Sequence, residues 1–254
     1  MPDLLDRASQ VGRALLDLIY PPRCPGCGRM GSAFCEQCQA RVELIEPPIC
    51  LHCGSTVPQE GLCARCRALS SNLDGIRAAA VFEDPLRQAI HALKYENNTT
   101  LATPLGAMMV DLWRRGGLPH TDLILPVPLH TRRQAERGYN QSALLARVLG
   151  RAVGIPVDDH TLIRQRATLP QVGLGPSERQ QNVEGAFACR GQMEGKTAVV
   201  VDDVCTTGAT LEACAAALRA GGAVSVWAFT LARARWVSGA GTAGGDLQDK
   251  SLRA

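Results

Sequence analysis

The segment from residue 197 to residue 231 limits most narrowly what this chain can fold into. Residues 197–201 (TAVVV) form a short apolar run rich in β-branched residues, which is typical of a strand buried on both faces. Residues 209–220 (ATLEACAAALRA) are strong helix formers, and the two glycines after them favour a helix end. A second apolar run, residues 224–231 (VSVWAFTL), resumes the strand pattern. The order strand, loop, helix, strand predicts an α/β fold with a parallel sheet.

Two neighbouring acids and a short polar loop join the first of these strands to the helix. Asp202 and Asp203 follow the strand, and the loop contains Thr206, Thr207 and Gly208. Ligands of open parallel sheets bind outside the carboxyl ends of the strands, where N–H groups at a helix N-terminus suit phosphate. Carboxylates repel phosphate but accept hydrogen bonds from a vicinal diol or face Mg²⁺. The segment therefore predicts a ribose 5-phosphate site. In the alternative, the acids only cap the helix, which needs one acid and leaves the loop unexplained.

Three other kinds of acidic or glycine-rich site fit the sequence poorly. A nucleoside triphosphatase needs a G-x-x-x-x-G-K-[ST] loop upstream of its acidic strand, and the sequence contains none. A dinucleotide site needs G-x-G-x-x-G after a strand, whereas residues 173–178 (GLGPSE) lack the third glycine. A receiver-type acidic pocket needs a long α/β chain after the paired acids, and too few residues follow them here.

Eight of the eleven cysteines lie between residues 24 and 66, in four C-x-x-C pairs. Such pairs do not persist as structural disulfides in a cytosolic chain, and four of them favour two structural zinc sites over thioredoxin-like redox chemistry. The predicted ligands are Cys24, Cys27, Cys35, Cys38, Cys50, Cys53, Cys63 and Cys66. If consecutive pairs share a zinc ion, the loops between them have seven and nine residues, which is shorter than in most zinc ribbons. Crossed pairing gives longer loops. The spacing therefore leaves both pairings open. His52 is interpreted as a non-ligand, because four thiolates compete with it.

The amino-acid composition allows a sizeable hydrophobic core but does not indicate a class of binding partner. The chain has 254 residues, of which 46% are hydrophobic and 20% charged. Its net charge of +3 does not by itself indicate nucleic acid. The basic residues are almost all arginines, which suit phosphate contacts, but a GC-rich genome explains the same bias. No secretory signal and no apolar run of membrane-spanning length is present, so we expect a cytoplasmic protein without a transmembrane segment.

The two ends of the chain differ from its body. Apolar residues in the segment 1–22 fall on one face of a helix that Pro21 and Pro22 end. We expect this amphipathic helix to pack on another domain, with membrane-surface or partner binding as the alternative. Residues 236–254 are rich in Gly, Ala and Ser, and we expect them to be disordered.

Periodicity and turn signals predict the elements between the cysteines and the strand–loop–helix–strand unit. Residues 68–75 are expected to form a linker, and residues 164–185, which lack steady periodicity, a long loop of the kind that is usually functional. The regular elements are expected as strands over residues 76–82 and 122–127, and helices over residues 85–95, 103–115 and 139–152. Residues 127–138 are expected to form a basic loop at the carboxyl end of a strand.

Several of these segments together resemble a known family. VVVDDVCTTGAT (199–210) resembles the phosphoribosyl pyrophosphate (PRPP) motif of type I phosphoribosyltransferases. IHALKYE (90–96), LPVPLHTRRQAERGYNQS (125–142) and LIRQRATLPQVGLGPSERQQNVEGAF (162–187) narrow the resemblance to the ComF competence-protein family, also called the ComFC or GntX type. The resemblance implies a double zinc ribbon over residues 23–68, with sequential pairing. It also implies a type I phosphoribosyltransferase-like parallel sheet with flanking helices over residues 76–235.

The resemblance also implies roles for individual residues. Asp202 and Asp203 would hold the ribose, and Mg²⁺ would accompany PRPP. The 5-phosphate would be held by Thr206, Thr207, Gly208, Ala209 and Thr210. Pyrophosphate would be bound by Arg132, Arg133 and Arg137. Residues 164–185 would close as a lid and bring Arg179 toward the leaving pyrophosphate, which makes Arg179 a catalytic candidate together with the two acids.

Two function hypotheses from different classes follow. The first is a phosphoribosyltransferase with an unidentified acceptor. A glutamine-dependent amidophosphoribosyltransferase is not expected, because its N-terminal catalytic cysteine is missing from the start Met-Pro-Asp. The second is a non-catalytic DNA-uptake protein that binds single-stranded DNA and partners such as a competence helicase, with PRPP only as a ligand. Aromatic stacking platforms normally support single-strand binding, and Phe34 is the only Phe, Tyr or Trp within residues 23–68, which weakens a DNA-only role.

Overall fold

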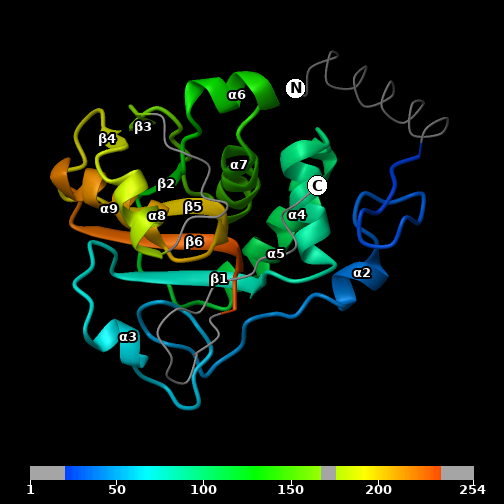
Figure 1. The fold of residues 1–254 in the computed structure, drawn as a ribbon, viewed down its shortest axis with the longest axis horizontal. Helices are drawn as coiled ribbons and strands as arrows, with labels where there is room; N and C mark the ends of the chain where they lie inside the picture. The colour runs from blue at the N-terminus through cyan, green and yellow to red at the C-terminus, as the bar shows by residue number, and fades with distance from the viewer. Residues whose placement is uncertain (1–20, 167–175, 236–254) are drawn as a thin grey trace.

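The centre of the molecule is a four-stranded parallel sheet in the order β1-β6-β5-β2 (Figure 1). The structure is a computed structural model that describes residues 21–166 and 176–235. The strands are β1 (Gly75–Val81), β2 (Leu123–Pro126), β5 (Thr197–Cys205) and β6 (Ser225–Arg233). The predicted α/β fold with a parallel sheet is confirmed. Residues 1–20 of the predicted N-terminal helix and the predicted tail lie outside the described residues.

Helices and a small antiparallel strand pair surround this sheet. The described helices are α2 (Glu36–Ala40), α3 (Ala64–Arg67), α4 (Leu86–Tyr95), α5 (Ala102–Arg114), α6 (Thr131–Arg137), α7 (Gln141–Val153), α8 (Pro176–Val183), α9 (Ala209–Ala220) and the 3₁₀ turn η1 (Thr99–Leu101). Strands β3 (Leu162–Arg164) and β4 (Phe187–Cys189) form a separate antiparallel pair. None of the helices in the described residues is long and apolar enough to cross a membrane.

The middle of β5 is buried from both sides, as its unbroken apolar run predicts. Val199 and Val201 belong to the core shared with α4, α5 and α7, whereas Ala198 and Val200 belong to the core shared with α9, β3 and β4. All four residues are fully buried. Because successive strand side chains point to opposite faces, Asp203 continues the side of Val199 and Val201.

Three predictions of irregular structure were wrong. Strand β5 extends through both acids to Cys205, because residues 202, 204 and 205 continue the parallel pairing with β6. The predicted basic loop contains α6. His130 caps the N-terminus of this helix, because its Nδ1 accepts a hydrogen bond from the Arg132 N–H at 3.3 Å. Gly138, with φ 78°, ends the helix. The predicted long loop includes α8 over residues 176–183.

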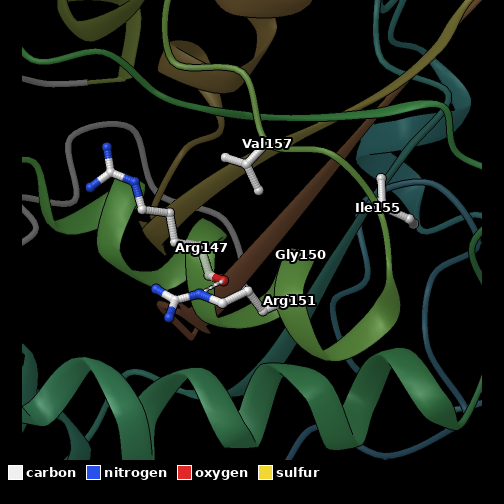
Figure 2. Close-up of a pocket in the computed structure, with 5 residues that line it drawn as sticks. All are labelled: Arg147, Gly150, Arg151, Ile155 and Val157. Atoms are coloured by element: carbon white, nitrogen blue, oxygen red, sulfur yellow. Dashed lines mark hydrogen bonds between the residues drawn. The ribbon is translucent and has the colours of Figure 1, made fainter. Parts of the chain in front are cut away.

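A hollow of about 270 Å³ lies where α7 meets the segment that follows it (Figure 2). The segment extends the sheet edge: Ile124 N–H donates to Pro156 O at 3.0 Å, and Asp158 N–H donates to Ile124 O at 2.9 Å. Gly150 permits this approach, because a Cβ there would lie 2.4 Å from Val157 Cγ2. Arg147 and Arg151 line the hollow with Gly150, Val157 and Ile155, and none of the residues predicted to bind a ligand takes part.

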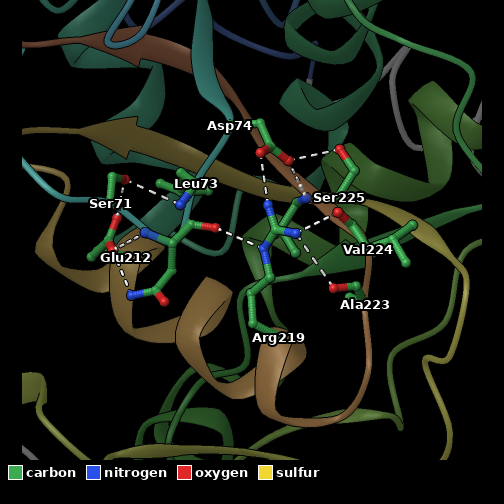
Figure 3. Close-up of polar contacts among 10 residues, drawn as sticks. Ser71, Leu73, Asp74, Glu212, Arg219, Ala223, Val224 and Ser225 are labelled. Carbon is green, nitrogen blue, oxygen red and sulfur yellow. Dashed lines mark hydrogen bonds and ion pairs between the residues drawn. The ribbon is translucent and has the colours of Figure 1, made fainter.

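The predicted linker, residues 68–75, is bound to α9 by a polar network (Figure 3). The Glu212 carboxylate accepts from Ser71 Oγ at 2.7 Å and from the Asn72 N–H at 2.5 Å. Arg219 Nη2 donates to Asp74 Oδ1 at 2.7 Å, and Asp74 Oδ2 accepts from Ser225 Oγ at 2.7 Å. The cysteine-rich region is therefore joined to the sheet through a segment that α9 holds in place.

Candidate functional site

The two acids at the end of β5 have different surroundings. Asp203 is 3% exposed, and its Oδ2 lies 2.5 Å from Lys94 Nζ, which reaches it from α4. Its Oδ1 accepts a long hydrogen bond, 3.4 Å, from Gln141 Nε2 of α7. Asp202 is half-buried, and its Oδ1 accepts hydrogen bonds from Ser142 Oγ at 2.7 Å and from the Asp203 N–H at 2.9 Å. Asp202 is thus the acid open to a ligand, and Asp203 supports it from the core.

The ion pair with Lys94 shifts the pKa values of the two acids in opposite directions. Burial raises the pKa of Asp203, but the Lys94 ammonium and its hydrogen bond outweigh burial, so the net pKa lies below its usual value. Burial lowers the pKa of Lys94, but Asp203 raises it above its usual value. Burial and the Asp203 charge raise the pKa of Asp202 to about 7, against the opposing effects of Lys94 and Ser142. Near neutral pH, Asp202 therefore exchanges a proton while Asp203 stays ionised.

We expect the raised pKa of Asp202 to appear in the pH dependence of stability. The folded chain keeps a proton on Asp202 up to about pH 7, whereas the carboxyl of the unfolded chain releases it near pH 3.8. The stabilisation is complete below that value and is lost as pH rises to about 7. The difference in unfolding free energy between wild type and Asp202→Asn should therefore fall by about 1 kcal/mol per pH unit between pH 5.5 and 7, and level off above pH 8.

Urea unfolding at pH 5.5, 6, 7 and 8 checks this dependence. The control is Asp111→Asn, which alters an exposed carboxyl on α5. A pH-independent difference between wild type and Asp202→Asn would show that Asp202 is ionised throughout.

Lys94 was not among the predicted site residues. In the sequence it is one lysine at the end of an otherwise apolar helix face, and nothing in that pattern names its partner. It lies near the C-terminal end of α4, and its ammonium reaches the Asp203 carboxylate. The same helix end contacts the end of α6 and the segment after it: Arg137 stacks on the Tyr95 ring at 5.2 Å, and the Tyr139 hydroxyl donates to the Leu93 carbonyl.

The predicted phosphate loop leads from β5 into α9. Gly208 is the N-cap of α9 and has φ 86°, a left-handed conformation that favours glycine. Thr206, Thr207, Ala209 and Thr210 are half-buried. The first turn of α9 directs backbone N–H groups and the positive end of the helix dipole toward this loop. Binding of a phosphate by residues 206–210 stays a prediction.

The predicted arginines of α6 have different partners. Arg132 is exposed and pairs with Glu136 at 2.8 Å, and Arg137 donates to Gln141. Arg133 interacts electrostatically with Arg164 of β3: burial lowers the pKa of Arg164, the Arg133 charge lowers it further, and the charges of Cys214 and Asp202 oppose both. Arg164, the first residue of the predicted lid, is therefore linked electrostatically to both Arg133 and Asp202.

Arg179, the remaining predicted catalytic residue, belongs to α8. Its side chain lies outside what the structure describes, as do residues 167–175 of the predicted lid. Its part in the site stays a prediction.

The eight N-terminal cysteines form two groups of four, each with its sulfur atoms within 4.8 Å of one another. The groups are sequential, so the crossed alternative is wrong: one contains Cys24, Cys27, Cys35 and Cys38, and the other contains Cys50, Cys53, Cys63 and Cys66. The Cys35 N–H points at Cys24 Sγ at 3.4 Å, and the Cys63 N–H points at Cys50 Sγ at 3.3 Å. Four thiolates with backbone donors fit structural zinc and leave no coordination position open for catalysis.

The two cysteine groups occupy different parts of the molecule. In Figure 1, α2 of the first group and α3 of the second lie toward opposite ends of β1. Cys24, Cys38 and Phe34 are part of the large core with α4 and α5. The second group forms a small cluster of its own.

Comparison with known proteins shows the family. The double zinc ribbon domain model matches residues 15–67, and the phosphoribosyl transferase domain model matches residues 138–237. DNA utilization protein YhgH of Salmonella typhi is 33% identical over 205 residues, which cover 79% of this chain and 90% of that protein. Competence protein F of Haemophilus influenzae is 32% identical over 211 residues, which cover 80% and 91%. The chain belongs to the ComF/YhgH competence family.

More distant relatives agree with this family. Competence protein ComFC of Bacillus subtilis is 27% identical over 207 residues, which cover 78% of this chain and 83% of that protein. Among solved structures, a purine phosphoribosyltransferase from Pyrococcus horikoshii is 16% identical and matches 53% of this chain and 85% of its own, with a TM-score of 0.33. A TM-score this low carries no argument, and the family assignment rests on the sequence relatives and the two matched domains.

In this ComF/YhgH protein, the candidate site is assembled from more than the matched phosphoribosyl transferase region. Asp202, Asp203 and the phosphate loop lie inside residues 138–237. Lys94 and the predicted pyrophosphate-binding arginines of α6 lie between the two matched regions. The intervening segment therefore contributes side chains to the site as well as core.

Proposed function

We propose that this chain binds PRPP at the carboxyl end of β5 and transfers its phosphoribosyl group to an acceptor nucleophile. The observation that supports this most is the half-buried Asp202 beside a left-handed glycine loop at a helix N-terminus, in a chain with a phosphoribosyl transferase domain. The nucleophile would form a bond to C1 of the ribose, while the bond from C1 to pyrophosphate breaks and pyrophosphate leaves with the electron pair.

Each part of PRPP has a counterpart in the site. Residues 206–210 would hold the 5-phosphate through backbone N–H groups. Asp202 would accept hydrogen bonds from the ribose hydroxyls, with Asp203 completing the pair from the core. Arg133 and Arg164, with Arg132, Arg137 and Arg179 as further candidates, would attract the pyrophosphate and stabilise its charge as it leaves.

We propose that Mg²⁺ enters with the pyrophosphate of PRPP. The two carboxylates and the Lys94 ammonium carry one net negative charge when both acids are ionised, and Asp203 is already paired. This donor set is weak for a bare divalent cation but suits one already held by phosphate oxygens. Bound there, Mg²⁺ would neutralise part of the pyrophosphate charge.

A second function rests on the relatives. YhgH is named for DNA utilization and competence protein F for competence, so we propose a link to DNA uptake or natural transformation for this chain as well. In a non-catalytic form of this role, the zinc ribbons would contact single-stranded DNA and partner proteins such as a competence helicase, with PRPP as a ligand. Arg23, Arg29 and Arg41 are exposed in this region and would supply salt-sensitive phosphate contacts.

Calorimetric titration of PRPP with Mg²⁺ tests the proposal. Wild type should bind, and Asp202→Asn/Asp203→Asn should bind about 10–100-fold more weakly, because charge-assisted hydrogen bonds to the ribose are lost. Asp111→Asn serves as the matched control and should bind like wild type. Absence of binding by wild type would contradict the proposal.

Pyrophosphate release separates the two functions. Wild type with PRPP, Mg²⁺ and pooled amines and bases should release pyrophosphate if the chain is an enzyme. Binding without release supports the uptake role, provided that single-stranded DNA binds near physiological salt with an affinity that falls as salt is added.

A further inference from the structure

The second zinc ribbon lies directly against the phosphate loop. Arg65 of α3, between the ligand candidates Cys63 and Cys66, extends its Nη2 to the Thr207 carbonyl at 3.3 Å. Because that carbonyl precedes Gly208, the contact holds the peptide that leads into the left-handed turn. A side chain of the ribbon thus constrains the loop that we propose binds the 5-phosphate.

A second bridge reaches the root of the same loop. Arg233, 5% exposed, donates from Nη1 to Cys205 Sγ at 3.1 Å and from Nε to Ser55 Oγ at 2.9 Å. The Ser55 hydroxyl also lies 3.3 Å from Cys53 Sγ of the second cysteine group. When Cys53 is a zinc-bound thiolate, this hydroxyl can donate to it while accepting from Arg233. Cys205 immediately precedes Thr206, so the bridge runs from a zinc ligand to the start of the loop.

Close packing around Ile76 of β1 also fixes the ribbon relative to the phosphate loop. The Ile76 N–H of β1 donates to His52 O at 2.7 Å, and a Cβ on Gly54 would lie 2.5 Å from Ile76 O. Ile76 Cδ1 in turn lies 3.6 Å from where a Cβ on Gly208 would be. One residue of β1 therefore separates the ribbon glycine from the loop glycine, which leaves little room for either to move independently.

We propose that the second zinc ribbon is part of the phosphate site, with Arg65 and Ser55 as positioning residues that hold residues 205–208 in the binding conformation. The inference rests on the proposed binding of a ribose phosphate by this loop. It predicts that loss of either bridge weakens binding of a sugar phosphate without affecting contacts made at the pyrophosphate end.

Two probes separate the ends of the site. Ribose 5-phosphate reports on the loop, and pyrophosphate with Mg²⁺ reports on the arginines. We expect Arg65→Ala to weaken ribose 5-phosphate binding about tenfold and Ser55→Ala about threefold, because each loses one polar contact to the loop or its root. Both variants should bind pyrophosphate with Mg²⁺ and retain zinc as wild type does. Arg65→Lys keeps one donor and should recover part of the loss.

Arg67→Ala is the matched control, since Arg67 is exposed on the same short helix, and its affinities should equal those of wild type. Equal affinity of wild type, Arg65→Ala and Ser55→Ala for ribose 5-phosphate would overturn the inference. Weakening by Arg65→Ala alone would also overturn the positioning role, because it would make Arg65 a direct ligand contact. If wild type binds neither ribose 5-phosphate nor PRPP, the proposed function fails first, and this inference fails with it.

Discussion

Replacement of Lys94 with methionine should lower the free energy of unfolding by about 3–5 kcal/mol. The Lys94 ammonium lies 2.5 Å from Asp203 Oδ2, and the Asp203 side chain is 4% exposed. Methionine preserves much of the length and apolar stem of lysine but leaves a buried carboxylate without its cation. Urea unfolding at pH 7 measures the loss.

Lys196→Met is the matched control, because Lys196 is exposed in the turn before β5. It should change stability by no more than about 0.5 kcal/mol. Adding Asp203→Asn to Lys94→Met should restore part of the loss, because the unpaired charge is removed. The loss should also shrink at lower pH, since without Lys94 burial leaves the pKa of Asp203 above its usual value and the carboxyl takes up a proton. Equal small losses for both lysine variants would show that the pair is solvated.

Removal of zinc should unfold the cysteine-rich region. Structural zinc supplies an apparent 10–16 kcal/mol, roughly, in zinc-finger peptides, and residues 23–68 contain little apolar core of their own. Metal analysis should find about two zinc ions per chain, because both groups have four thiol ligands. Cys24→Ser and Cys50→Ser should each reduce the content to about one.

The two cysteine variants should differ in their effect on the body of the protein. Both residues are fully buried, so they are matched in exposure. Cys24 belongs to the core that includes α4, so its loss should lower the midpoint of thermal unfolding for the whole chain. Cys50 belongs to the small separate cluster, and its loss should act mainly on the ribbon and the phosphate loop beside it. Cys189→Ser, outside both groups, should retain two zinc ions. Two zinc ions in Cys50→Ser would contradict the assignment.

Much of the fold could be predicted from local patterns. The helix over residues 209–220 has the predicted bounds, and the strands predicted to begin at residues 76, 122 and 224 begin at residues 75, 123 and 225. The errors came where a local signal was weak. Pairing with β6 extended β5 through two acids, and a His130 cap together with Gly138 produced a helix in a segment that looked like a basic loop.

Local sequence patterns were enough to predict the strand–loop–helix–strand unit, the paired acids that follow its apolar run and the C-x-x-C pairs. Each depends on residue types a few positions apart, which act through local backbone preferences and short ligand spacings. Three interactions depend on the tertiary structure: Lys94 pairs with Asp203, the Asp202 charge acts on Arg164, and Arg65 donates to the Thr207 carbonyl. These contacts join residues far apart in the chain, and they depend on which helix covers which face of the sheet. That arrangement follows from packing the whole core, and no local pattern contains it.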